Sequence, residues 1–142
     1  MQYLLDLHTH TLASGHAYNT IAEMAKAAAE KGLQLLGITE HSVKMPGTCH
    51  AFYFSNLKAV ERRQYGVQLL MGAELNVIDY NGTIDLKPYL LEGLDFCVAS
   101  FHIPCITPGT IEENTHAACC VMENPYVMIL GHPDDARYPF DY

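Results

Sequence analysis

Histidines and one glutamate recur at the ends of short apolar runs in this chain. The first run, residues 3–7, leads into His8 and His10, which are separated by a single residue. In a β-strand, residues two apart point to the same side, so both imidazoles would project together from the strand's end. Neutral imidazole is a common ligand for transition metals, and two on one face provide half of a metal site.

The same arrangement follows each later apolar run. The side chains that end these runs are, in chain order, His41, Glu74, His102 and His132. Because the carboxyl ends of parallel strands meet on one rim of an α/β barrel, we expect these side chains to converge. His16, in the loop just beyond the first run, can reach the same rim. Such a series at five successive strand ends indicates a metal site.

The ligand types predict which ions the site would bind. One carboxylate with several imidazoles favours zinc, manganese or iron over magnesium and calcium, which prefer oxygen ligands. These ligands are too many for one tetrahedral ion, so we expect a cluster of two or three ions, with Glu74 as the bridging ligand. Paired ions stabilise the entering and leaving oxygens of a displacement and generate hydroxide near neutral pH. The residues therefore predict a hydrolase, most naturally of phosphate esters.

Alternating strands and helices must position these ligands. The apolar runs predict parallel strands at residues 3–10, 33–39, 67–73, 94–100 and 126–130. Helices are predicted between them, at residues 21–31, 52–64, 88–92 and 111–123. Thr20 and Glu23 have the spacing of a capping box, and Asn81-Gly82 predicts a hairpin turn. The fold predicted is α/β, with about five βα units in a single domain, residues 1–142.

Composition narrows the class of protein. The 142 residues are 49% hydrophobic, and only 17% are charged, as expected of a globular domain with a core. A formal net charge of −8 would repel nucleic acid, so no nucleic-acid partner is expected. The five cysteines form no CxxC pair, which favours free thiols in a reducing compartment. With no apolar run near the roughly twenty residues of a membrane span, we expect a cytoplasmic protein without a membrane partner.

The ordered motifs of the chain resemble those of a known family. The motifs are Asp6-Leu7-His8-Thr9-His10, Thr39-Glu40-His41, Gly72-Ala73-Glu74, Ser100-Phe101-His102 and Gly131-His132-Pro133-Asp134. Together they resemble the PHP (polymerase and histidinol phosphatase) superfamily. The segments around His16 and from Met45 to His50 are most similar to its small phosphatases of the YcdX type.

The resemblance implies a fold, a cofactor and a reaction. The family fold is a distorted (β/α)7 TIM-like barrel with a trinuclear centre, usually of zinc or manganese. By this resemblance, one ion is held by His8, His10 and Glu74, and Glu74 bridges to a second ion on His102 and His132. His16 and His41 would hold the third ion. Family members hydrolyse phosphomonoesters with a metal-bound hydroxide as nucleophile.

One departure from the family pattern shapes our expectations. The family's last metal motif, an Asp-x-His, has no counterpart after His132, and such barrels run to about 250 residues. We therefore expect a C-terminally truncated PHP domain, an incomplete barrel in which the first and third ions lack ligands and the ion count can be lower. An open sheet exposes apolar edges, so a homo-oligomer that covers them is a further hypothesis.

Residues near the rim are candidates for other roles. Lys44, His50 and Arg137 lie in loops after rim positions and could bind the substrate phosphate. Asp6 shares a strand face with the first two histidines and is a candidate to orient an imidazole. Glu40 alternates to the opposite side of its strand and is not predicted to be a ligand.

The sequence leaves three functions open. The main hypothesis is a metal-dependent phosphatase acting on a small phosphorylated substrate. The alternatives are a nuclease-type PHP module and a truncated, metal-binding fragment without efficient catalysis. A basic groove would favour the nuclease, and the acidic composition of the chain does not provide one.

Overall fold

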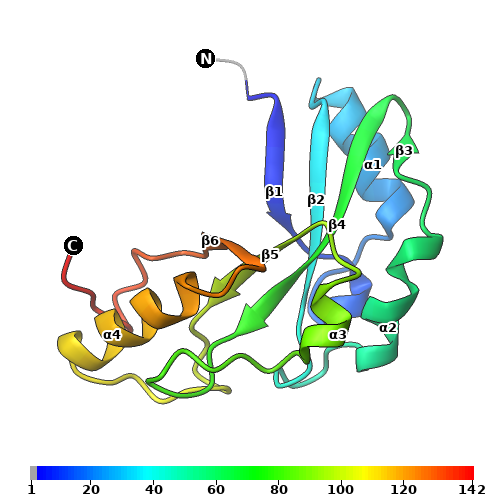
Figure 1. Ribbon diagram of the computed structural model, residues 1–142. Helices are drawn as coiled ribbons and strands as arrows, with labels where there is room; N and C mark the ends of the chain where they lie inside the picture. The colour runs from blue at the N-terminus through cyan, green and yellow to red at the C-terminus, as the bar shows by residue number, and fades with distance from the viewer. Residues whose placement is uncertain (1–2) are drawn as a thin grey trace.

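A curved, mostly parallel sheet forms the centre of the computed structural model, which describes residues 3–142 (Figure 1). The parallel strands, in spatial order, are β1 (Leu5–Thr9), β2 (Leu35–His41), β4 (Val67–Asn76), β5 (Phe96–Ser100) and β6 (Val127–Leu130). A short strand, β3 (Arg63–Gln64), pairs antiparallel with β4. Figure 1 shows β1 and β2 upright and β6, at the other edge of the sheet, running crosswise to them, so the sheet curves into a half-barrel. The predicted α/β fold, an incomplete TIM-like barrel, is confirmed.

Helices connect the parallel strands on the outside of the half-barrel. They are α1 (Ile21–Glu30), α2 (Ala51–Asn56), α3 (Pro88–Leu91) and α4 (Ile111–Met122), with 3₁₀ turns η1 (Leu12–Ser14) and η2 (Leu57–Ala59). The predicted capping box at Thr20 and Glu23 is present, and a second one at Thr110 and Glu113 begins α4. Among residues 3–142, no helix is long and apolar enough to cross a membrane.

The core lies between the central strands and the helices that cover them. The β4 residues Leu69, Met71, Ala73 and Leu75 share one face of the strand and are fully buried. Glu74 and Asn76, on the opposite face, are buried as well, so this end of β4 is covered on both faces. Tyr138, from the segment after β6, is also buried and donates its hydroxyl to the Ile106 carbonyl oxygen at 2.8 Å. Tyr138, with the partly buried Phe140, therefore packs against the same core as the sheet.

The predicted helix over residues 52–64 is wrong in its second half. Helix α2 ends at Asn56, and the chain turns extended at Val60 before β3 begins. Tyr65 and Gly66 both have positive φ, 50° and 83°, and join β3 to β4 as a two-residue hairpin turn. Gly66 therefore marks a hairpin turn and not the end of a helix.

The predicted turn at Asn81-Gly82 is confirmed. Ile78 donates its backbone N–H to the Thr83 carbonyl oxygen at 2.9 Å, and Val77 forms an antiparallel bridge with Ile84. This excursion, residues 77–85, follows the carboxyl end of β4 and brings Asp85 back beside that strand. All five cysteines are free, as the sequence predicted.

Candidate metal centre

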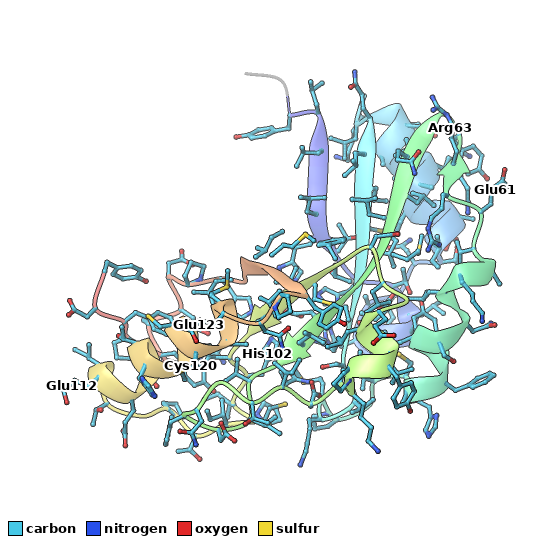
Figure 2. The ribbon with its side chains drawn as sticks, viewed as in Figure 1. Glu61, Arg63, His102, Glu112, Cys120 and Glu123 are labelled. Carbon is cyan, nitrogen blue, oxygen red and sulfur yellow. The ribbon has the colours of Figure 1, made fainter. Side chains whose placement is uncertain are left out.

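The carboxyl ends of the parallel strands surround one buried carboxylate. Glu74 lies in the central strand β4, paired in register with His41 of β2, and is only 1% exposed. Six of the seven predicted ligands line a single open depression of about 410 Å³: His8, His10, His41, Glu74, His102 and His132. Figure 2 shows His102 near the middle of the molecule, far from Glu61 and Arg63 beside β3.

Five imidazole nitrogens face the two oxygens of Glu74. The separations are 3.0 Å for His8 Nε2, 3.3 Å for His10 Nε2, 2.7 Å for His41 Nδ1, 3.3 Å for His102 Nε2 and 3.1 Å for His132 Nε2. A carboxylate has about four lone-pair sites, so it cannot accept a good hydrogen bond from each of five donors. A positive charge between the imidazole nitrogens and the carboxylate would therefore stabilise this arrangement.

The geometry of these atoms fits bound metal ions. His41 Nδ1 and Glu74 Oε2 are buried yet form no well-oriented hydrogen bond, although they lie 2.7 Å apart. Two ligands of a tetrahedral ion, each about 2.0–2.1 Å from it, are separated by about 3.3 Å, close to most of these distances. Two compact sets of possible ligands are present: His8, His10 and Glu74, and His41, Glu74 and His102. Glu74 belongs to both sets.

The charge states of the metal-free centre suit metal binding. Burial alone would raise the pKa of Glu74, but the histidine nitrogens around it outweigh the effect of burial and hold the pKa well below its usual range. Burial lowers the pKa of His41, against the opposing effect of Glu74. For His132 the hydrogen bond to Glu74 dominates and raises the pKa. Near neutral pH the carboxylate is ionised and His41 is neutral, as metal ligands must be.

A bulge at the end of β1 directs the side chains of His8 and His10 into the depression. The pairing of β1 with β2 shifts register between Asp6 and Thr9. Thr9 turns inward, where its hydroxyl donates to the Gly37 carbonyl oxygen at 2.6 Å. Its neighbours His8 and His10 both reach the depression, with ring centroids 5.2 Å apart, so the predicted common face of these two residues is confirmed.

His132 reaches the centre through an unusual backbone. Its φ of 30° is rare for a residue with a side chain. A Cβ on the preceding Gly131 would clash with the Ser100 hydroxyl and lie 3.0 Å from Val98 Cγ1, so a larger residue here would require these β5 side chains to shift. Backbone strain of this kind persists where surrounding contacts hold it, and it often marks a functional site.

The remaining predicted site residues do not line the depression. The ring of His16 is exposed, with its centroid 4.6 Å from that of His41. His50 is exposed and accepts the Phe52 N–H at the start of α2, at 3.2 Å. Arg137 is exposed and pairs with Asp135 at 2.6 Å, and Lys44 is exposed. Their substrate-binding roles stay predictions.

Sequence reasoning missed the residues that contact the ligands from behind. His10 Nδ1 lies 2.9 Å from Ser14 Oγ, and His102 Nδ1 lies 2.8 Å from Asn76 Oδ1. Asp6, the predicted orienting residue, accepts only the backbone N–H of His8, at 3.2 Å. Asn76 could have been found, since it follows Glu74 by two residues on the same strand face.

Comparisons with known proteins agree with the geometry. A family model described as PHP domain matches residues 6–132. A protein named "Probable phosphatase" from Clostridium novyi is 55% identical over 141 residues, and one from Acetivibrio thermocellus is 45% identical over 141 residues. A third, from a Thermoanaerobacter species, is 48% identical over 142 residues. Each match covers 99% of this chain and 58% of the relative, so the chain spans little more than half the length of these relatives.

Proposed function

This chain belongs to the PHP domain family, and from that premise we propose that it is a metal-dependent phosphatase that hydrolyses phosphomonoesters. The observation that carries the proposal is the set of five imidazole nitrogens around the buried carboxylate of Glu74. The names of the relatives support phosphatase chemistry, and the ligand set supports its dependence on metal.

The proposed centre holds at least two ions of zinc or manganese, with iron as a third option. Imidazoles with one carboxylate suit these ions better than magnesium or calcium. Glu74 is shared by the two ligand sets and would bridge two ions. His132 would add a ligand through its Nε2, 3.1 Å from Glu74 Oε1. We propose His16 as a further ligand, since its ring centroid lies 4.6 Å from that of His41.

In this proposal the protein's own residues hold the metal ions, offset part of their charge and bind the substrate. Bound ions would polarise a phosphoryl oxygen and lower the pKa of a coordinated water. Glu74 supplies the negative charge that holds those ions in a buried place, and the neutral histidines leave them a net positive charge for the anionic substrate. The depression is open to solvent, which suits a small phosphorylated substrate, and Lys44, His50 and Arg137 are the proposed contacts for its outer part.

The test is restoration of phosphatase activity by metal. The protein is stripped with a chelator, dialysed, and assayed for hydrolysis of p-nitrophenyl phosphate before and after addition of zinc or manganese. We expect no turnover in the stripped protein and recovery with either ion. If metal binds but no phosphomonoester is hydrolysed, the phosphatase proposal fails and the chain is a metal-binding domain only.

A further inference from the structure

Two carboxylates outside the depression are connected to histidines inside it, each through one neutral side chain. We propose that Ser14, held by Glu40, is a positioning residue for His10, and that Asn76, held by Asp85, is a positioning residue for His102. Each fixes its histidine as the tautomer with the proton on Nδ1, so that the unprotonated Nε2 faces the metal ions. This inference rests on the proposed function for the identity of the ions. The hydrogen bonds themselves determine the tautomers without reference to any ion.

The first connection runs from Glu40 through Ser14 to His10. Glu40 is fully buried and accepts hydrogen bonds from the Thr11 hydroxyl at 2.5 Å and the Thr11 N–H at 3.0 Å. Ser14 Oγ lies 2.6 Å from Glu40 Oε2 and accepts the backbone N–H of His41 at 3.0 Å. Donors surround the Glu40 side chain, which is the arrangement of an ionised carboxylate.

The single hydroxyl proton of Ser14 determines which ring nitrogen of His10 carries a proton. An ionised carboxylate only accepts, so the Ser14 proton is donated to Glu40. The remaining contact, 2.9 Å from Ser14 Oγ to His10 Nδ1, then requires the imidazole to donate. In neutral His10 the proton is therefore on Nδ1, and Nε2 carries a lone pair directed at Glu74 Oε2, 3.3 Å away. Two lone pairs at that distance repel unless a cation lies between them.

The second connection runs from Asp85 through Asn76 to His102. Asp85 accepts from the Ser42 hydroxyl, from the Lys44 N–H at 2.7 Å and from the Asn76 N–H at 3.0 Å. The Asn76 side-chain amide adds a fourth hydrogen bond at 2.7 Å, so its NH₂ group faces Asp85. Its carbonyl oxygen therefore faces His102 Nδ1 at 2.8 Å.

The orientation of Asn76 fixes the tautomer of His102. A carbonyl oxygen only accepts, so His102 Nδ1 donates, and its bare Nε2 faces Glu74 Oε1 at 3.3 Å. Two segments far apart in sequence, the loop after β1 and the excursion after β4, thus prepare two histidines in the same way. Such contacts behind a ligand orient its ring and raise its basicity toward a metal.

The first test reads the tautomers directly. Long-range ¹H–¹⁵N spectra of the metal-free protein at about pH 8, above the usual histidine pKa of about 6.5, distinguish Nδ1–H from Nε2–H. We expect Nδ1–H for both His10 and His102. In Ser14→Ala, His10 should lose this preference while His102 keeps it, and Asn76→Ala should do the reverse. An Nε2–H form of either ring in the unaltered protein would overturn the inference, whether or not the variants fold.

The second test measures zinc affinity by competition with a chromophoric chelator. Loss of a contact behind a metal ligand typically costs 10–100-fold in affinity, so we expect Ser14→Ala to weaken zinc binding by about that factor. Ser55→Ala is the matched control, because the Ser55 hydroxyl donates to the Phe52 carbonyl oxygen on α2, away from the depression. Equal zinc affinity in both variants would contradict the positioning role. If the unaltered protein takes up no zinc or manganese, the proposed function fails, while the spectra still decide the tautomers.

Discussion

Among single residues, Glu74 determines what the depression can bind. It carries the buried negative charge on which five histidines converge, and it is shared by both possible ligand sets. Its own pKa is held low, so the charge persists across the physiological range. In the proposed centre the histidines would set the positions of the metal ions, and Glu74 would supply negative charge that offsets the charge of these cations.

Glu74→Gln should remove this charge with little change in volume. We expect the loss of at least one metal ion per chain and a fall in phosphatase turnover of about 100-fold or more, because even residues behind a ligand cost 10–100-fold. Elemental analysis and p-nitrophenyl phosphate hydrolysis on one sample measure both. Glu61→Gln is the matched control, since Glu61 is exposed and lies far from the centre (Figure 2). Full metal content in Glu74→Gln would contradict the central role of this carboxylate.

His132 should make both stability and metal binding depend on pH. Its pKa is raised in the folded, metal-free protein, chiefly by the hydrogen bond to Glu74. This contact therefore stabilises the metal-free protein below the unfolded-state pKa of about 6.5, and the stabilisation is lost as pH rises through the higher folded value. Metal binding has the opposite trend, because a ligand must be neutral, so affinity rises over the same window.

Thermal unfolding with and without zinc, from about pH 6 to about pH 8, measures both trends. The gain in melting temperature on adding zinc should increase with pH. His132→Gln should reduce the pH dependence of the metal-free protein. If the variant has the same pH dependence of melting temperature as the unaltered protein, groups other than His132 control that dependence.

At the scale of elements, the turn of the β3–β4 hairpin contributes to the stability of the fold through the backbone conformation of Gly66. Gly66 has φ of 83°, and no atom lies within 4 Å of where its Cβ would be. Gly66→Ala should therefore destabilise the fold by about 1 kcal/mol through backbone strain alone. Gly93→Ala is the control, because its added Cβ would make only an ordinary contact, 3.6 Å from the Leu90 carbonyl oxygen. Denaturant unfolding measures the difference, and equal stabilities of the two variants would contradict the turn assignment.

The sequence predicted the strands and the side chains that meet at their carboxyl ends because both follow from local patterns. Short apolar runs predict strands, those of the central strands β2, β4 and β5 are largely buried, and parallel strands bring their carboxyl ends to one rim. The hairpin at Tyr65 and Gly66 was missed because a glycine after a helical pattern also reads as a helix end. Ser14 and Asp85 were missed for a different reason. Their contacts depend on how two loops return to the sheet, which no periodicity encodes.

At the scale of the whole molecule, the half-barrel leaves two strand edges open. Within residues 3–142, β1 and β6 each pair with only one strand of the sheet. Leu5 on β1 is 54% exposed and Met128 on β6 is 62% exposed. Open edges with exposed apolar side chains favour pairing with another chain. The hypothesis that a second copy covers these edges stays a prediction.

Light scattering across a range of concentrations tests this hypothesis. We expect a dimer to form as concentration rises, and Leu5→Lys, which places a charge at the β1 edge, to shift the equilibrium toward monomer. Lys58→Leu, on the exposed part of η2 and away from both edges, is a comparison that should not disrupt the dimer. A monomer at every concentration would contradict the prediction.

The most direct test of the metal centre is the number of metal ions per chain, measured by elemental analysis after reconstitution with zinc or manganese and removal of free metal. The shared position of Glu74 between two ligand sets predicts at least two ions per chain. One ion or none would contradict a multinuclear centre built by these residues.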